Sequence, residues 1–379
     1  MKIRPLNALL LHVVVLLAGV AFAFPLAWMV LTALKPLEQT MTLPPVWLPH
    51  RLYLPDTDPP VEARQVGRFE RPMVRIERDD TGETEWVPRE YVSGGELRVI
   101  SSTGEETARF VHVLEEIDAS PEAPWYRLRA IHPDGSLGEE RLLPADQVTR
   151  RISLRWDNFI LALRAMRMFP RYLANTVVLC LLTVCGTVIS CALVAYGFSR
   201  IDWPGRDRLF ILALATMMIP FPVVMVPLYG LFRWLGWIGS LKPLWVGAWF
   251  APPFYVFLLR QFFLTIPAAL ADAARIDGCN EFAIFRRVLL PLVKPALLVV
   301  ALFQFMATWN DFLGPLIFLT DQRDFTLALG LQYFQSQHGG TEWHYLMAAS
   351  TVVILPVIVL FFFTQRTFIE GISMTGLKE

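Results

Sequence analysis

The sequence predicts an all-α polytopic membrane protein with six transmembrane helices and a β-rich domain inserted between helices 1 and 2. Of its 379 residues, 54% are hydrophobic, the formal net charge is zero and the mean hydropathy is +0.44. This balance lies outside the range of ordinary soluble domains. Several apolar stretches also reach the roughly 20 residues that a helix needs to cross the hydrocarbon core of a bilayer.

The first apolar run, residues 8–34, is interpreted as an uncleaved span. It follows Lys2 and Arg4 and continues to Lys35, well past the roughly 7–15 apolar residues of a signal peptide. The basic N-terminus favours a cytoplasmic start under the positive-inside rule. Residues 1–36 are therefore expected to form the N-terminal segment and the first span.

Residues 37–155 change to charged sequence that is punctuated by proline and glycine and contains short β-rich runs. Two segments look alike, residues 74–92 and 126–148, because each combines a hairpin turn with a later strand that contains a proline. We expect a small β-barrel or β-sandwich with an internal repeat. Because one span precedes it, this insert is predicted to lie outside the cytoplasm.

Five further spans are predicted in the remaining part of the chain, residues 156–379. They are residues 172–198, 209–232, 243–263, 296–320 and 346–364. Six spans return the C-terminus to the cytoplasm, so the segments that carry arginine or lysine between them fall on the inner side. The expected location is the bacterial inner membrane, with both termini cytoplasmic.

The inner segment 264–295 does not look like a span. Pro267 is placed to begin a helix, five alanines give that helix a small-residue surface, and Gly278 can end it in a left-handed cap. Such a helix can lie deep in a cleft of another protein. An amphipathic linker on the membrane surface explains the pattern equally well.

This segment resembles the "EAA" loop of binding-protein-dependent ABC transporter permeases, in which Glu-Ala-Ala, three residues and Gly form the helix that docks into the ATPase subunit. The match is Asp272-Ala273-Ala274 with Gly278, followed by Leu290-Pro291. Aspartate replaces the glutamate of the family, which keeps the charge on a shorter side chain. The resemblance implies these ATPase-coupling residues: Asp272, Ala273, Ala274, Arg275, Asp277 and Gly278.

The resemblance covers residues 8–48 and 156–379, and its nearest form is the MalG-like permease of carbohydrate importers. Other matching stretches are Phe24-Pro-Leu-Ala-Trp-Met29, Asn175-Thr176, Leu258-Leu-Arg-Gln-Phe262 and Trp309-Asn-Asp-Phe312. It implies the fold of a type I ABC importer permease. The expected partners are a cytoplasmic ABC ATPase dimer, a second permease subunit, an extracytoplasmic solute-binding protein and membrane lipid.

No Gly-x-x-x-x-Gly-Lys-Ser/Thr loop is present, so the chain is not expected to be an enzyme, and ATP hydrolysis is expected on the partner. No cofactor is expected in this chain, because ATP and magnesium would bind to the ATPase. The cysteines and histidines match no metal-binding spacing. The neutral charge argues against a nucleic-acid partner.

Polar side chains of the fifth span are candidates for the translocation pathway. Asn310 and Asp311 lie within it, where a charge usually faces the bundle interior or a wet cavity, and Gln304 is a weaker candidate. Pairing of Asp311 with a neighbouring helix or with the partner permease explains it equally well. Asn175 and Thr176, which open the second span, are better explained as helix capping.

Two other classes of function stay open. An ATP-independent transporter predicts no ATPase partner. A membrane-anchored sensor or scaffold that works through the β-rich insert predicts function in the isolated insert and tolerance of changes at Asp272 and Gly278. Both are less favoured because neither explains the loop and the other matches together. The solute is a carbohydrate only by resemblance, so polyols and glycerol phosphates stay open.

Overall fold

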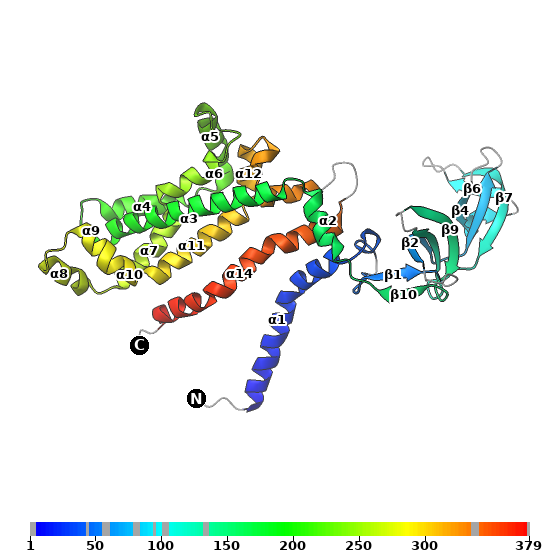
Figure 1. Ribbon diagram of the computed structural model, residues 1–379, viewed down its shortest axis with the longest axis horizontal. Helices are drawn as coiled ribbons and strands as arrows, with labels where there is room; N and C mark the ends of the chain where they lie inside the picture. The colour runs from blue at the N-terminus through cyan, green and yellow to red at the C-terminus, as the bar shows by residue number, and fades with distance from the viewer. Residues whose placement is uncertain are drawn as a thin grey trace. The chain divides into compact units, whose positions relative to one another are not determined.

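The computed structural model describes residues 5–42, 45–54, 61–78, 84–93, 96–100, 106–131, 136–334 and 341–376. The chain forms two compact units, Met1–Trp156 and Asp157–Glu379. The first unit holds helix α1 (Pro5–Ala33) and the described strands, and the second is helical (Figure 1). A β-rich region near the N-terminus and a helical membrane part are thus both present, as the sequence predicts.

The described residues of the first unit form two five-stranded antiparallel sheets with the same pairing pattern. One has the order β10-β1-β2-β8-β9, and the other, listed from its opposite edge, β5-β6-β7-β3-β4. Their strands are β1 (His50–Tyr53), β2 (Glu62–Phe69), β3 (Met73–Arg78), β4 (Thr84–Pro88), β5 (Val92–Ser93), β6 (Glu96–Ile100), β7 (Glu106–Ile117), β8 (Trp125–Ile131), β9 (Leu137–Pro144) and β10 (Thr149–Ile152).

The two alike segments of the sequence occupy equivalent places in the two sheets. The β3–β4 hairpin is followed by a 3-10 turn, η2 (Arg89–Tyr91), and β5, while the β8–β9 hairpin is followed by a short turn and β10. However, β2 pairs with β8 and not with β3, and β7 pairs with β3 and not with β8. Two five-stranded repeats have therefore exchanged their last three strands.

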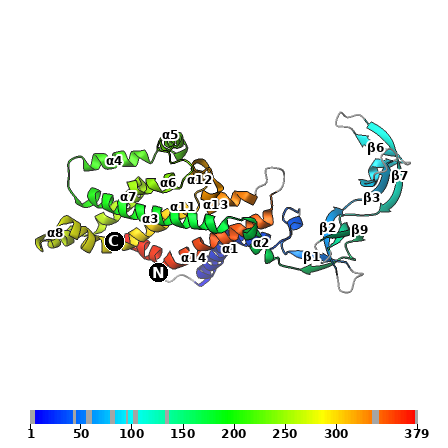
Figure 2. The ribbon, with the colours of Figure 1, turned by 45° about the horizontal axis from the view of Figure 1, so that its top comes forward.

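The helices of the second unit are α2 (Asp157–Ala165), α3 (Phe169–Arg200), α4 (Arg206–Thr216), α5 (Phe221–Trp234), α6 (Lys242–Val246), α7 (Pro253–Thr265), α8 (Ala268–Ile276), α9 (Glu281–Ala283), α10 (Leu290–Leu292), α11 (Lys294–Trp309), α12 (Leu313–Phe318), α13 (Leu327–Gly330) and α14 (Trp343–Gly376). Helix α3 runs alongside α7 and α11 (Figure 2). Shorter helical turns are η1 (Leu37–Gln39), η3 (Gly247–Phe250), η4 (Ile284–Leu289), η5 (Gln322–Asp324) and η6 (Leu331–Phe334).

Among the described residues, three helices are long and apolar enough to cross a membrane: Leu11–Ala33 of α1, Phe169–Arg200 and Trp343–Gln365 of α14. Three bent helix pairs raise the number to as many as six if each pair is one span. The pairs bend by 96° between α4 and α5, by 74° before α8, and by 78° before α11.

The structure corrects three of the predicted continuous spans, since residues 243–263 are interrupted before α7, where Ala251 has φ 49°. Residues 209–232 are interrupted between α4 and α5, where Pro220 precedes the new helix in an extended conformation. Residues 296–320 are interrupted after Trp309, where α11 ends. Proline lacks the N–H that would continue a helix, which explains the break before α5; a side-chain cap accounts for the break after α11, as described below.

Candidate coupling site

Helix α8 begins and ends where the sequence predicts. Pro267 precedes it in an extended conformation, and its missing N–H costs nothing at a helix start. At the other end Gly278 has φ 81°. The N–H of Gly278 donates to the carbonyl of Arg275 at 3.0 Å and that of Cys279 to the carbonyl of Ala274 at 2.9 Å. These two bonds form a Schellman cap, which gives the helix a fixed end.

The small residues of α8 do not all face outward. Ala271 and Ala274 are buried in the chain's own core, whereas Ala273 is exposed and Ile276 is 87% exposed. Ala271 and Ala274 therefore do not contribute to the exposed small-residue surface of the helix, and the coupling role of Ala273 and Ala274 stays a prediction. The spacing of three residues between Ala271 and Ala274 places both on the inner face of the helix.

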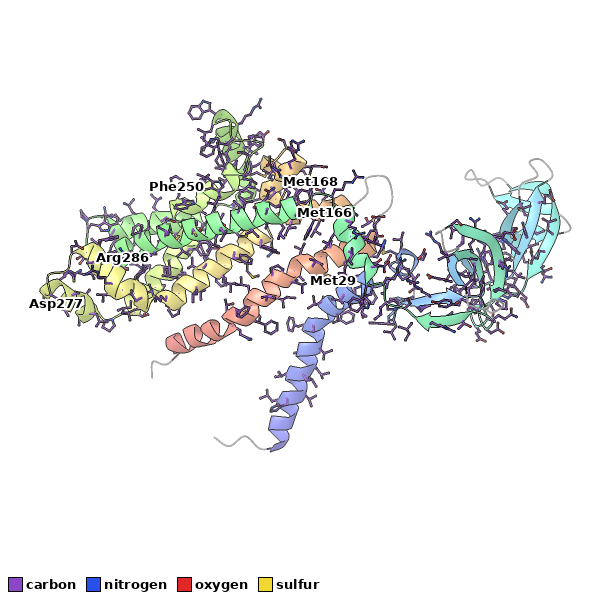
Figure 3. The ribbon with its side chains drawn as sticks, in the orientation of Figure 1. Met29, Met166, Met168, Phe250, Asp277 and Arg286 are labelled. Atoms are coloured by element: carbon purple, nitrogen blue, oxygen red, sulfur yellow. The ribbon has the colours of Figure 1, made fainter. Side chains whose placement is uncertain are left out.

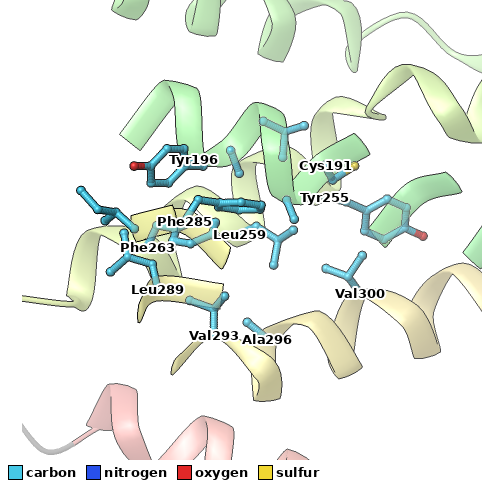
Figure 4. Packing of buried hydrophobic residues seen from close by; sticks show 14 of the residues in the cluster. Cys191, Tyr196, Tyr255, Leu259, Phe263, Phe285, Leu289, Val293, Ala296 and Val300 are labelled. Atoms are coloured by element: carbon cyan, nitrogen blue, oxygen red, sulfur yellow. The ribbon is translucent and has the colours of Figure 1, made fainter. Parts of the chain in front are cut away.

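The buried alanines pack against an apolar cluster that joins α8 to α3, α7 and α11 (Figure 4). Among its members are Tyr196, Leu259, Phe263, Phe285, Leu289 and Val300. Phe285 and Leu289 belong to η4, a π-helical stretch that follows α9. A π turn is wider than an α turn, so it changes which side chains of a helix point inward. Here three side chains of the π-helical stretch are buried in the core. The segment is thus bound to the membrane helices by packing.

Charged side chains of α8 are paired within the chain. Nη1 of Arg275 lies 2.7 Å from Oδ1 of Asp272, and its Nε lies 2.9 Å from Oε1 of Glu281. The other carboxylate oxygen of Glu281 accepts from the hydroxyl of Tyr196 at 2.5 Å. A continuous polar chain therefore runs from Asp272 on α8 to Tyr196 near the end of α3.

A second contact joins α3 to the start of this segment. The Arg200 guanidinium donates to the carbonyls of Phe263, in the last turn of α7, and of Ile266, which directly follows α7. A cation is favourable at the C-terminus of a helix because it meets the unpaired carbonyls there. Arg200, together with Tyr196, fixes the end of α7 and the start of α8 to α3.

Asp277 lies at the tip of the segment, at the same end of the second unit as Arg286 (Figure 3). Both side chains are exposed. Asn280 caps the next helix, because its side chain accepts from the N–H of Ala283 at 2.8 Å. The predicted residues Asp272, Arg275, Asp277 and Gly278 thus gather on one exposed turn, together with Ala273.

The pathway candidates are divided by the break after α11. Nε2 of Gln304 donates to the hydroxyl of Thr308 at 3.0 Å, and that hydroxyl lies 2.9 Å from the hydroxyl of Thr183 on α3. Asn310 follows the helix end, is exposed, and donates from Nδ2 to the carbonyl of Met306 at 2.9 Å. Gln304 therefore belongs to a polar ladder between two helices.

Asp311 lies in the irregular break and not inside a helix. Its Oδ1 accepts from the N–H of Gly314 at 3.1 Å, which caps the start of α12. The carboxylate is half-buried. An acceptor at this place satisfies a backbone donor that a broken helix leaves unpaired, which explains how the chain tolerates an interruption here.

The expected capping role of Asn175 and Thr176 is wrong. Helix α3 begins at Phe169, so both residues lie in its second turn. Nδ2 of Asn175 donates to the carbonyls of Arg323 and Phe325, and the hydroxyl of Thr176 accepts from the N–H of Leu327 at 2.9 Å. Both side chains hold a later loop against α3, and this long-range contact has no local sequence signal.

Comparison with known proteins gives the chain a family. The model described as "Binding-protein-dependent transport system inner membrane component" matches residues 170–373. The arabinooligosaccharides transport system permease protein AraQ of Bacillus subtilis (strain 168) is 36% identical over 225 residues, which cover 59% of this chain and 79% of AraQ. The trehalose/maltose transport system permease protein MalG of Thermococcus litoralis is 33% identical over 212 residues, which cover 55% and 76%.

The fold also has a solved counterpart. A chain in the crystal structure of a bacterial ABC transporter involved in the import of the acidic polysaccharide alginate aligns with a TM-score of 0.52 and 22% identity, over 57% of this chain and 80% of that one. The family match begins at residue 170 and so leaves the β-rich unit outside it. Because the family model matches more than half of the chain, the chain belongs to the binding-protein-dependent transport system inner membrane components, the permease subunits of ABC importers.

Proposed function

We propose that this permease forms half of the translocation pathway for a sugar or related solute, and that α8 couples the pathway to a separate ATPase. The observation that carries the coupling role is the structure of α8. Its C-terminal end is exposed and is capped by two backbone hydrogen bonds, while its inner face is packed into the core of the membrane helices. An outer face free for contact and a fixed inner face are what a docking element needs.

Motion of α8 would reach the membrane helices by rigid contact. The polar chain from Asp272 to Tyr196 and the Arg200 bonds to the end of α7 join α8 to α3. Packed elements of this kind move as a body. We infer that displacement of α8 by the closing ATPase pair tilts α3 and α7, which alternates access to the pathway.

The arrangement in the membrane is part of the same proposal. Three long apolar helices and three bent helix pairs, each counted as one span, support six spans. Both termini would then lie on the cytoplasmic side, with α8 at the cytoplasmic end of its bent pair, and the β-rich unit would lie outside. The unit would then lie where a solute-binding protein docks. A second permease subunit, an ATPase dimer and this binding protein complete the proposed complex in the bacterial inner membrane.

A sugar is favoured because the relatives AraQ and MalG are named for the transport of arabinooligosaccharides and of trehalose and maltose. In the pathway we place Gln304 and Asn310, which offer uncharged donors and acceptors of the kind that hydroxyl groups need. Asp311 would contribute through the shape of the break that it caps. The polar ladder of Gln304, Thr308 and Thr183 offers further hydroxyl groups beside them.

The first experiment is affinity purification of the tagged chain from its native membrane, followed by identification of co-purifying subunits and an ATPase assay. We expect an ABC ATPase, a second permease and hydrolysis that is stimulated by one solute-binding protein. Recovery of the chain alone and without ATPase activity would overturn the proposal.

Substitutions on the two faces of α8 sharpen the test. Ala273→Trp adds bulk to the exposed face and should leave the chain folded while the ATPase is lost from the complex. Ala274→Trp adds the same bulk to the buried face and should lower the thermal stability of the chain itself. Ala273→Ser is the matched control that should keep the ATPase. If the ATPase subunit still co-purifies fully with Ala273→Trp, α8 is not part of the interface with the ATPase.

A further inference from the structure

The end of the β-rich unit next to α1 exposes a row of apolar side chains. Met41 is 71% exposed and Ile152 is 68% exposed, and Trp47, Leu48 and Leu154 are also exposed. We call these five residues the apolar rim. They come from the segment that follows α1, from the last residue of β10 and from the residues that follow β10, so they are distant in sequence but close to both connections of the unit.

Contacts within the unit bring these two segments together. The N–H of Arg155 donates to the carbonyl of Leu34 at 3.0 Å, and β1 pairs with β10 with His50 opposite Ile152. The ring of Trp47 lies 5.4 Å from that of Trp28 on α1, measured between centroids. Since Leu11–Ala33 of α1 is long and apolar enough to span a bilayer, the rim begins where that span ends.

An arginine-rich cleft of about 1100 Å³ lies beside the rim. Its charged lining is formed by Arg51, Arg64, Arg68, Arg71, Arg150 and Arg155 against Glu38, Glu62 and Glu70. Six arginines against three glutamates give the lining a formal excess of three positive charges, one of which, on Arg71, is paired with Glu90 outside the lining at 3.0 Å. The cleft also includes Pro36 and Val46 from the segment that follows α1, so it opens at the same end of the unit.

The glutamates are already occupied. Glu38 pairs with Arg64 at 2.6 Å, and Glu62 with Arg51 at 2.6 Å; Glu70 pairs with Arg68 at 2.7 Å. Each guanidinium carries five N–H donors, so one carboxylate leaves donors unused. The lining therefore keeps an excess of positive charge and of N–H groups.

Arg150 and His50 also bear on the positive charge of the cleft. The guanidinium of Arg150 donates to the hydroxyl of Tyr126, a neutral partner. Burial lowers the pKa of His50, and the nearby charge of Arg150 lowers it further, while a hydrogen bond to the carbonyl of Leu48 opposes the shift. Burial acts against a charge of either sign, so only the contribution of Arg150 reflects the positive charge of the cleft.

We propose that this end of the β-rich unit rests on the membrane surface, with the apolar rim in the interface and the arginine cleft holding the phosphate groups of anionic phospholipids. Apolar and aromatic side chains next to a span prefer the headgroup boundary. Guanidinium groups bind phosphate oxygens in pairs. This role goes beyond the proposed transport function and does not depend on the solute or on α8.

The test is hydrogen exchange of the full-length chain in lipid nanodiscs made of phosphatidylcholine, with or without phosphatidylglycerol. We expect the backbone of residues 36–54 and 62–71 to exchange more slowly with the anionic lipid, roughly fivefold for each arginine engaged. Equal exchange in both lipids would overturn the proposal. Equal slowing by inorganic phosphate in phosphatidylcholine alone would also overturn it, because a free anion would then suffice.

Variants separate lipid contact from loss of fold. The double variant Arg68→Gln and Arg150→Gln should lose the effect of phosphatidylglycerol, and Arg141→Gln, an exposed arginine outside the cleft, should keep it. Met41→Ser with Ile152→Ser should raise exchange in both lipids. Unchanged exchange in β3 shows that each variant is folded. An effect of the anionic lipid that survives the double arginine variant would exclude the cleft as the site.

Discussion

Helices α8 and α12 are both short helices next to a break in a longer helix, but they differ in which side chains are exposed. Helix α8 exposes one face, with Ile276 at 87% exposure, and ends in open space. In α12, Gly314, Pro315 and Phe318 are buried. One break presents a surface that a partner can contact, and the other closes a gap inside the chain.

The glycines of the two helices show the same difference. Gly278 is needed for its backbone angle, since φ is 81° and a Cβ there would meet nothing within 4 Å. Gly314 is needed for its small size, because a Cβ would stand 2.5 Å from Oδ2 of Asp311 and 3.1 Å from Cδ2 of Leu244. Replacement of Gly278 is therefore expected to strain the backbone, whereas replacement of Gly314 is expected to cause a steric clash.

The largest effect is expected for Gly314→Ala. The added methyl group must displace the carboxylate of Asp311 or the α6 side chain of Leu244, which should destabilise the chain by about 1–3 kcal/mol. Thermal unfolding in detergent measures this as a lower Tm. Gly197→Ala on α3, where a Cβ meets nothing within 4 Å, is the matched control and should not lower the Tm.

Gly278→Ala should cost about 1–2 kcal/mol, because an L-residue is strained at positive φ. Since the position is open, the strain should fray the end of α8 without unfolding the rest. Hydrogen exchange of residues 268–279 should therefore rise while the Tm changes little. Gly278→Asn should be milder, because asparagine tolerates this conformation. Equal effects of Ala and Asn would indicate a steric cause at this position.

Replacement of Asp311 separates capping from a role of its charge. Asp311→Ala removes the acceptor for the N–H of Gly314 and should cost about 1 kcal/mol. Asp311→Asn keeps an oxygen acceptor and should keep both the Tm and solute uptake. If Asp311→Asn keeps the Tm but abolishes uptake in reconstituted vesicles, the charge itself serves the pathway and the cap is secondary.

The sequence predicted the parts of this fold that depend on local rules. Proline and glycine mark both ends of α8, and the alternating runs with turn residues mark the strands of the insert. The family resemblance, drawn from Asp272-Ala273-Ala274 with Gly278 and the other motifs, is confirmed by the family match over residues 170–373 and by the sugar-transport relatives. Its implied contacts with an ATPase stay a prediction.

What the sequence could not predict depends on distant contacts. Nothing near Tyr196 announces that its hydroxyl meets Glu281, 85 positions later. The exchange of strands between the two β repeats is equally hidden, since the same local pattern fits a strand that pairs with either repeat. The fifth span appeared continuous because apolar residues flank Asn310 and Asp311 on both sides, and only the structure shows that α11 ends at Trp309.

The smallest effect is expected in the polar chain of α8. Arg275 and Glu281 are both exposed in part, with 42% and 47% of their side chains accessible, so water screens their attraction. Glu281→Gln should therefore cost less than about 1 kcal/mol, and the amide oxygen can still accept from Tyr196. A double-mutant cycle with Arg275→Gln, followed by Tm in detergent, measures the interaction.

A coupling energy near zero in the isolated chain would still allow a role in the complex. The same cycle is therefore repeated on ATPase activity of the purified transporter. If the Arg275–Glu281 pair transmits the movement of α8, breaking it should uncouple hydrolysis from uptake although the Tm is unchanged. Tyr196→Phe should also uncouple hydrolysis from uptake. If hydrolysis stays coupled to uptake in all three variants, packing of Ala271 and Ala274 alone carries the movement. The functional difference between α8 and α12 would then come from surface exposure and not from charge.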